Sequence, residues 1–409
     1  MRTLILLAIL AVLLPFESCK KKTVTPDLTP KKIELSAKGA EVIAVNNAFG
    51  IALFTGTAAE ESENLMVSPL SASTALCMLL NGCGGNTFTQ IKEMLGYPET
   101  MSIAEINEAY RVLVGQLLNA DPKVNLALAN AIFYRSGFNV KQTFLNIMQS
   151  EFEARIEGLD FSSPSALTTI NKWASDNTNG KINKVLDEIS GDAVMFLMNA
   201  LYFKGDWTYK FDPALTDDRQ FLLDNGTSAD VPTMNGEVGS KCAYGDGYKA
   251  IELPYGRTNF TMVIIVPDTT LSGFYNGFTD ETWAYLTSTL DGYLEYGSVE
   301  VSLPKFKFSY EKCLNDQLKA MGMLDAFNPS LADLSGIADA SIYVNFVKQN
   351  TFVDVNEEGT EAAAVTTIGI DATSMPEPTI FIVDKPFVFA IRERTTNTLM
   401  FIGQVTDPR

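Results

Sequence analysis

Histidine is absent from all 409 residues of the sequence. Catalytic triads and Cys-His dyads use an imidazole as their base, and most zinc sites use one as a ligand. The absence therefore excludes these hydrolases and the usual imidazole metal sites. A Ser-Lys dyad, a carboxylate pair or a metal site of oxygen ligands stays open, but no Asp or Glu stands out by its spacing. A GxxxxGK[ST] phosphate loop and a CxxC pair are also lacking, so we expect no metal and no other cofactor.

Basic residues are scarce, with 31 Lys and Arg against 49 Asp and Glu and a formal net charge of -18. This balance argues against a nucleic-acid surface and against a general polybasic membrane surface. The composition, 46% hydrophobic and 20% charged, is typical of a soluble globular chain large enough for one big domain or two ordinary ones. Because no internal repeat and no Gly/Ser-rich linker divides the chain, we expect a single domain.

The N-terminus has the features of a processing segment. An apolar run over residues 4–14 follows Arg2 and is too short to span a bilayer. A small residue and then Cys19 come shortly after this run, which resembles a bacterial lipoprotein signal. We therefore expect residues 1–18 to be removed and Cys19 to carry the lipid. Plain secretion is the alternative.

Residues 19–41 are predicted to tether the lipid to a folded domain of residues 42–409. From Lys20 to Lys32 the chain is polar, contains two prolines and shows no apolar periodicity. The three lysines directly after Cys19 would face anionic headgroups. We expect a lipid-anchored protein of the cell envelope, on the periplasmic face or at the cell surface.

Four further cysteines have no evident partner. Cys77 and Cys83 lie six residues apart in a helical pattern, where positions i and i+6 do not share a face. Thiols outside the cytoplasm can pair, but apolar neighbours favour buried free thiols that behave as small hydrophobes. We therefore predict no disulfide for these two cysteines or for Cys242 and Cys313.

Apolar periodicity predicts helices that alternate with long strands. This mixture, with hairpin-like junctions, predicts an α+β fold. The predicted helices span residues 42–55, 69–82, 87–95, 103–118, 141–154, 166–177, 282–290 and 314–323, and the predicted strands span 124–134, 193–207, 250–254, 261–267 and 299–308.

The stretch from Asn356 to Pro378 has the properties of both a loop and a strand. Acidic residues and Gly359 open it and two prolines close it, but its middle is small, β-branched and uncharged. Alternation from Thr360 gives one face of small and aliphatic residues, and the opposite face carries Glu361 and Asp371. A long connection without structure of its own is usually functional or disordered, so we interpret the stretch as a segment with two states. An ordinary strand followed by a turn is the alternative.

Residues 357–364 have the sequence Glu-Glu-Gly-Thr-Glu-Ala-Ala-Ala. This segment closely resembles the hinge of the serpin family, and several other parts of the chain resemble the same family. The resemblance covers residues 42–409 and implies a serpin-like single domain with a large central sheet, further sheets, about eight or nine helices and an exposed reactive-centre loop. The other matching segments are residues 129–131, 170–173, 178–182, 199–207 (which ends in Trp207), 384–389 and 403–408.

The resemblance implies that the stretch is bait for a protease. When a serpin is cut, the exposed segment inserts as an extra strand in the main sheet, and the protease is carried along as a covalent acyl-enzyme. The inhibitor needs no catalytic residue of its own, so the absence of histidine does not count against this function. The hinge implied by the resemblance comprises Glu357, Gly359, Thr360, Ala362, Ala363, Ala364 and Thr366.

The composition of the hinge suits insertion. Its inward residues Thr360, Ala362, Ala364 and Thr366 are small enough to slide between existing strands. A gain of about 0.5–1.5 kcal/mol for each new hydrogen bond, and of roughly 1.5–3 kcal/mol for each of two buried isoleucines, competes with about 1–2 kcal/mol of ordering entropy per residue. We therefore expect insertion to be favourable and the uncut form to be kinetically trapped.

One position departs from the family pattern. The strand before the hinge usually carries His-Lys in serpins, whereas this chain has Gln349-Asn350. The resemblance places this side chain in a buried polar cluster with Asn199 and with Ser68, the N-cap candidate of the helix that starts at Pro69. Gln349 donates and accepts hydrogen bonds but cannot become cationic, so we expect a cluster with no pH switch near neutrality.

Two ways of counting place the bait bond differently. Family spacing counted forward from the hinge places it after Thr373, whereas spacing counted back from the closing strands points to Met375. A proline follows Met375, and a proline just after the cut suits few proteases. We favour the bond between Thr373 and Ser374, with Ser374–Met375 and the bond after Ile370 as alternatives.

No Lys or Arg occurs between Gln349 and Asp384, so a trypsin-like pocket finds no cation to pair with its carboxylate. We expect target proteases of elastase-like, subtilisin-like or papain-like preference, an inhibitor that is a monomer, and no nucleic-acid partner. The leading hypothesis is covalent inhibition of a serine or cysteine protease. A non-inhibitory serpin that acts as a binder or chaperone is the alternative, and an enzyme is disfavoured because no catalytic constellation is present.

Overall fold

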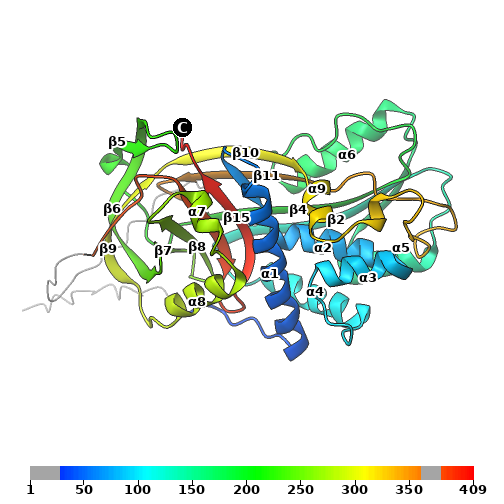
Figure 1. Ribbon diagram of the computed structural model, residues 1–409, viewed down its shortest axis with the longest axis horizontal. Helices are drawn as coiled ribbons and strands as arrows, with labels where there is room; N and C mark the ends of the chain where they lie inside the picture. The colour runs from blue at the N-terminus through cyan, green and yellow to red at the C-terminus, as the bar shows by residue number, and fades with distance from the viewer. Residues whose placement is uncertain (1–27, 361–378) are drawn as a thin grey trace, which may run out of the picture.

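Two β-sheets organise the chain in the computed structural model, which describes residues 28–360 and 379–409 (Figure 1). The smaller sheet has six strands and the larger has nine. The six-stranded sheet has the order β10 (Phe306–Cys313), β11 (Lys348–Asn356), β12 (Gly359–Thr360), β4 (Met195–Asp206), β2 (Val124–Arg135) and β3 (Arg155–Leu159). The nine-stranded sheet has the order β1 (Leu65–Val67), β15 (Thr398–Val405), β14 (Phe387–Glu393), β8 (Phe260–Pro267), β7 (Tyr248–Tyr255), β6 (Ser228–Gly245), β9 (Gly297–Pro304) and β13 (Thr379–Ile382), and β5 (Asp217–Leu222) pairs with β6.

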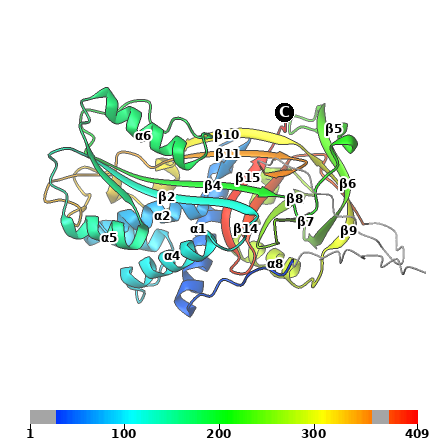
Figure 2. The same cartoon turned by 180° about the vertical axis from the view of Figure 1, so that it is seen from behind.

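Helices cover both faces of the six-stranded sheet. The described residues form nine α-helices, and α6 lies on one face of this sheet while α1, α2, α4 and α5 lie on the other (Figures 1 and 2). Ile170 and Trp173 of α6 pack with Phe133 of β2 and Phe196 of β4 in one buried cluster. The nine helices are α1 (Ala37–Ala58), α2 (Pro69–Leu80), α3 (Gly85–Met94), α4 (Ile103–Leu117), α5 (Gln142–Phe152), α6 (Pro164–Asn177), α7 (Leu271–Tyr275), α8 (Asp280–Asp291) and α9 (Asn315–Ala320).

The helix α2 lies at the centre of the molecule, and its sequence shows why it forms. Ser68 is its N-cap and accepts a hydrogen bond from the backbone N of Ser71 at 3.2 Å, while Pro69 occupies the first turn. All of its residues except Ala75 are buried. Because this helix is apolar on every side, it is stable only inside the protein, where it packs against β4 and β15.

The helix α1 is the one helix in the described ranges that is long and apolar enough to cross a membrane. Its side chains Val42, Phe49 and Leu53 are buried in the largest hydrophobic cluster of the protein. The contacts of α1 with α2, α4 and β15 therefore identify it as a core helix.

The α+β prediction is confirmed, and each of the eight predicted helices corresponds to an observed one. One predicted strand, residues 299–308, is wrong, because β9 ends at Pro304 and β10 begins at Phe306. The break at Lys305 transfers the chain from the nine-stranded to the six-stranded sheet. A proline that cannot donate to a ladder provides the natural end for β9.

The folded unit also begins earlier than residue 42. The helix α1 starts at Ala37, and Ile33 before it is only 4% exposed. The backbone N of Lys31 donates to Oδ1 of Asn259 at 2.8 Å. Residues 28–41, which the sequence assigns to the tether, therefore pack against the domain.

Candidate functional site

The two-residue strand β12 lies between β11 and β4 at one end of the six-stranded sheet. Gly359 and Thr360 pair with the last two residues of β11 on one side and with Asp206 and Gly205 of β4 on the other. Within the described residues, no ladder joins β11 directly to β4 beyond Thr360. We call the place between β11 and β4 the central strand position. The first two residues of this position are Gly359 and Thr360, at the start of the hinge.

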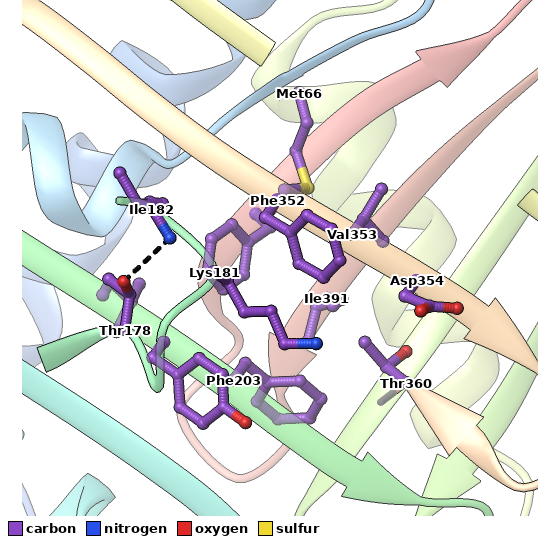
Figure 3. A pocket seen from close by; sticks show the side chains of 13 residues that line it. Met66, Thr178, Lys181, Ile182, Phe203, Phe352, Val353, Asp354, Thr360 and Ile391 are labelled. Atoms are coloured by element: carbon purple, nitrogen blue, oxygen red, sulfur yellow. Dashed lines mark hydrogen bonds between the residues drawn. The ribbon is translucent and has the colours of Figure 1, made fainter. Parts of the chain in front are cut away.

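A pocket lies beyond Thr360, along the same strand position (Figure 3). The segment of residues 178–182, which follows α6, covers it, and Thr178 Oγ1 accepts a hydrogen bond from the backbone N of Ile182 at 3.0 Å. Lys181 Nζ lies 5.0 Å from the centre of the Phe352 ring. The pocket is lined by Phe352, Val353 and Asp354 of β11, by Leu201, Tyr202 and Phe203 of β4, and by Met66, Thr178, Lys181, Ile182, Thr360, Ile391 and Phe401.

Trp207 fixes the turn that leads into β12. Its backbone N donates to the carbonyl of Glu358 at 2.8 Å, and its indole Nε1 donates to the carbonyl of Asn356 at 2.9 Å. The indole ring stacks on Tyr255 with the ring centres 4.4 Å apart. The sequence identified Trp207 only as the end of a segment that matches the family, and the structure places it in direct contact with the hinge.

Gly359 cannot be replaced by a larger residue in this position. Its φ angle is +147°, and an added Cβ would lie 2.1 Å from the carbonyl oxygen of Gly205. Only glycine combines this backbone conformation with such close contact to β4. Gly359 thus lets the chain enter the sheet between its two neighbouring strands.

Thr360 is the last described residue of the hinge and is buried, with 4% exposed. Its Oγ1 and the hydroxyl of Tyr255 form a hydrogen bond of 2.6 Å. Burial raises the pKa of Tyr255 well above its usual range, although this hydrogen bond acts to lower it. The phenol therefore stays protonated and available to the hydroxyl of Thr360.

Two ion pairs hold the turn before β12. The carboxylate of Glu357 lies 2.9 Å from Lys305 Nζ and accepts a hydrogen bond from Thr216 Oγ1 at 2.8 Å. The carboxylate of Glu358 lies 2.5 Å from Nζ of Lys210. Burial alone would raise the pKa of Glu357, but the hydrogen bonds from Lys305, its own backbone and Thr216 outweigh it and lower this pKa.

Gln349 lies beneath the central strand position. It is 8% exposed, and its amide forms two hydrogen bonds of 2.9 Å with the backbone N and carbonyl of Ser68. Ser68 Oγ also donates to the carbonyl of Met400 at 2.8 Å. Because the amide of Gln349 is neutral at all ordinary pH values, these bonds tie β11 to the start of α2 without a titratable group.

The polar cluster expected around Gln349 is only partly formed. Asn199 donates instead to Oδ1 of Asn130 on the neighbouring strand at 2.7 Å, and Asn130 donates to the carbonyl of Phe152 at 2.8 Å. Oδ1 of Asn199 is buried and has no hydrogen-bond partner. The structure therefore brings Ser68 and Gln349 together and places Asn199 in a separate pair.

The four cysteines of the described residues are all free. Cys77 is buried, and burial raises the pKa of its thiol to about 12. Cys83 and Cys242 are partly buried, whereas Cys313 is exposed, so the expectation of a buried thiol is wrong for Cys313. Cys313 is the last residue of β10, which is an edge strand of its sheet. Its neighbour Leu314 is buried, but Cys313 itself is exposed.

The remaining predicted site residues lie outside the described residues. They are Cys19, Ala362, Ala363, Ala364, Thr366, Ile370, Thr373, Ser374 and Met375. In the part of the chain that the structure describes, no group of three or more Cys, Asp or Glu residues could hold a metal ion.

Sequence reasoning missed the partners of the hinge. Lys305, Lys210, Thr216 and Tyr255 contact residues 357–360 but come from strands and connections far away in the sequence. Lysine, threonine and tyrosine are common, and no local pattern distinguishes these four. Only Lys305 could have been noticed in the sequence, because it directly follows Pro304, the proline at which β9 ends.

Comparisons with known proteins agree with this geometry. Residues 44–408 match the serpin (serine protease inhibitor) family. An uncharacterized serpin-like protein of Methanosarcina acetivorans is 33% identical over 91% of this chain and 88% of its own length.

Two solved structures have the same fold. The native state of tengpin, a thermophilic serpin, has a TM-score of 0.81 and 30% identity, and the match covers 92% of this chain and 96% of tengpin. Thyroxine-binding globulin in complex with thyroxine has a TM-score of 0.80 and 27% identity over 90% of this chain and 99% of its own. Both the sequence match and the fold match extend over nearly the whole chain. The chain therefore belongs to the serpin family.

Proposed function

We propose that this protein inhibits serine or cysteine proteases by offering residues 361–378, here called the bait segment, for cleavage. The observation that carries the proposal is β12, which already lies between β11 and β4. A chain cut within the bait segment would extend β12 along the same strand position and drag the attached protease with it as an acyl-enzyme.

The energetics favour this extension. In the part of the chain that the structure describes, the facing edges of β11 and β4 are not joined by a ladder beyond Thr360. A new strand there would gain backbone hydrogen bonds on both sides, each worth about 0.5–1.5 kcal/mol net. The inward residues after Thr360 by alternation, Ala362, Ala364 and Thr366, are small. They can therefore enter without overpacking the apolar residues that line the pocket.

The experiment that tests inhibition uses a panel of proteases. The purified protein is incubated with elastase-like, subtilisin-like, papain-like and trypsin-like enzymes, and complexes that survive SDS are sought. We expect such complexes with one or more of the first three classes. Their absence with every protease, although the bait segment is cut, would refute inhibition.

A binding function is the second candidate. The fold is shared with thyroxine-binding globulin, which was solved in complex with thyroxine. A serpin that only binds does not need a bait segment able to insert. The small residues of the hinge in this chain therefore favour the inhibitor, and a cleaved protein that never traps a protease would favour the binder.

We also infer that the protein is anchored to a membrane of the cell envelope through lipid on Cys19. The apolar run shortly before this cysteine and the small residue that precedes it support the inference. One acyl chain alone binds membranes only marginally, so stable anchoring needs several chains or a basic segment, and three lysines follow Cys19. The variant Cys19→Ala should appear in the soluble fraction. If it sediments with membranes as fully as the parent, the anchor is wrong.

A further inference from the structure

Exposed apolar side chains gather around the C-terminal end of α8. Tyr285 on this helix is 63% exposed, and Tyr293 and Leu294 directly after it are 48% and 100% exposed. Tyr244, at the end of β6, is 63% exposed. Its pKa is raised by desolvation, by the thiol of Cys242 and by the nearby phenol of Tyr293. We call these four residues the α8 patch. A fully exposed leucine beside three exposed tyrosines is typical of a surface that another phase or partner covers.

The chain enters the domain beside this patch. The carbonyl of Leu28, the first described residue, accepts a hydrogen bond from Thr258 Oγ1 at 2.6 Å. Arg394 in turn donates to the carbonyl of Thr258 at 3.3 Å and lies 3.7 Å from Asp291, the last residue of α8. Figures 1 and 2 both show the described stretch before α1, residues 28–36, running beside α8. Leu28 is thus linked through two side chains to the end of the helix that leads into Leu294.

This entry point limits how far the patch can be from a lipid on Cys19. Eight residues, 20–27, lie between Cys19 and Leu28. An extended chain spans at most roughly 3.3–3.6 Å per residue step, or about 30 Å in all. Leu28 must therefore lie within this distance of the bilayer. The tether gives any surface close to Leu28 a high effective concentration at the lipid.

The chemistry of the patch fits the interfacial layer of a bilayer. Tyrosine is enriched at membrane interfaces because its ring is apolar and its hydroxyl stays wet. Leu294 presents an apolar side chain with no protein contact to lose. Exposed Glu295 beside it disfavours deep insertion, and exposed Lys31 and Lys32 near the entry point can meet phosphate groups.

We propose that the α8 patch is the membrane-contacting surface of the anchored protein, with Tyr293 and Leu294 in the interfacial layer of the bilayer. The proposal rests on the anchoring inferred above. It adds that the domain does not swing freely on its tether but lies with one defined side against the lipid. Two other occupants, a second copy of the chain and the segment of residues 19–27, are outcomes of the test.

The test replaces Leu294 by a fluorescent reporter. The mature chain, with a histidine tag in place of Cys19, is bound to phosphatidylcholine vesicles that contain a nickel-chelating lipid, so the experiment does not depend on lipidation. The natural chain has no histidine to compete with the tag. The variant Leu294→Trp is compared with the matched control Leu331→Trp, because Leu331 is also exposed, at 58%, but lies in a different part of the chain. The natural tryptophans Trp173, Trp207 and Trp283 are all buried.

Brominated phosphatidylcholine quenches only tryptophans that reach the lipid. We expect it to lower the added fluorescence of Leu294→Trp at least about twofold and that of Leu331→Trp by less than about a tenth. Equal quenching at both positions, or none at Leu294→Trp, would overturn the proposal.

Two further measurements separate the other outcomes. Sedimentation of the untagged chain without vesicles should show a monomer, and a dimer that is lost in Leu294→Asp would assign the patch to a second copy. Deletion of residues 20–27 in the chain without vesicles should leave the fluorescence of Leu294→Trp unchanged. A shift would show that this segment covers the patch and would overturn the proposal. A failure of the Cys19→Ala fractionation leaves these results intact, so anchoring and contact are tested separately.

Discussion

Glu357 and Lys305 show how much of the hinge depends on single contacts. Glu357 was identified from the sequence because it opens a family-like motif, but its partner comes from the break between β9 and β10. The lowered pKa of Glu357 means that its ionised form stabilises the folded turn. This contribution is present above the ordinary carboxyl pKa and is lost as the pH falls through the lowered value.

The first prediction at this scale concerns Glu357→Gln. The amide keeps a hydrogen-bond acceptor for Thr216 but loses the ion pair with Lys305, and the turn before β12 should weaken by about 1 kcal/mol. Spontaneous loss of inhibitory activity on mild heating should then become roughly fivefold faster. Lowering the pH should speed up this loss of activity in the parent protein. It should change the rate for Glu357→Gln less.

A matched control for this variant is Glu151→Gln. Glu151 on α5 forms an ion pair of 3.2 Å with Arg111 on α4, so this variant makes the same change of charge at a residue that contacts neither the hinge nor the pocket. An equal effect of both variants would show that net charge, not the Glu357 contact, is responsible.

The second prediction at this scale concerns Thr360→Arg. Thr360 is buried against Tyr255, and a charged side chain there would lose solvation without gaining a partner. Insertion should stall, so the protease should cut the bait segment and leave. Gel analysis should show cleavage without covalent complex. Alternation places Glu361 on the opposite face of the strand, so Glu361→Arg should still form the complex. A normal yield of complex from Thr360→Arg would contradict this assignment.

At the scale of the element, the sequence predicted the helices and strands whose bounds depend on nearby residues. The N-cap of α2 at Ser68, the apolar stripe of α4 and the long strands β2 and β4 were found within a few residues of their observed bounds. The split of residues 299–308 into β9 and β10 was missed, although the apolar alternation changes phase between Leu303 and Phe306. Which sheet each strand joins depends on partners far away in the sequence, and a single sequence does not contain that information.

The placement of β12 could not be predicted for the same reason. The sequence indicated that residues from Thr360 could form a strand, but it did not show that Gly359 and Thr360 are already paired on both sides. Asn199 illustrates the opposite error. The resemblance placed it with Gln349, whereas the cross-strand neighbour Asn130 takes its amide.

The prediction at this scale is the position of the bait bond. We expect cleavage between Thr373 and Ser374, because Met375 is followed by a proline and no Lys or Arg lies in the bait segment. Mass spectrometry of the C-terminal fragment released from a trapped complex locates the bond. A cut before Ile368, or stoichiometric trapping of trypsin, would refute the assignment.

At the scale of the whole molecule, the fold and the family followed from the sequence, but the state of the central sheet did not. Among the described residues, β12 pairs on both sides and β11 and β4 are not directly joined beyond it. A bait segment that inserts after cleavage, as we propose, would form new backbone hydrogen bonds with both strands. The native form is therefore expected to be less stable than the form in which the bait segment has been cut and inserted.

The most direct test of this account is the unfolding temperature before and after cleavage within the bait segment by a protease that is not trapped. Insertion of about a dozen residues should stabilise the cleaved parent by several kcal/mol and raise its unfolding temperature by on the order of 10 °C. Cleaved Thr360→Arg should show little or no rise. If the cleaved parent unfolds at the same temperature as the intact protein, the bait segment does not insert between β11 and β4, and the proposed mechanism of inhibition is wrong.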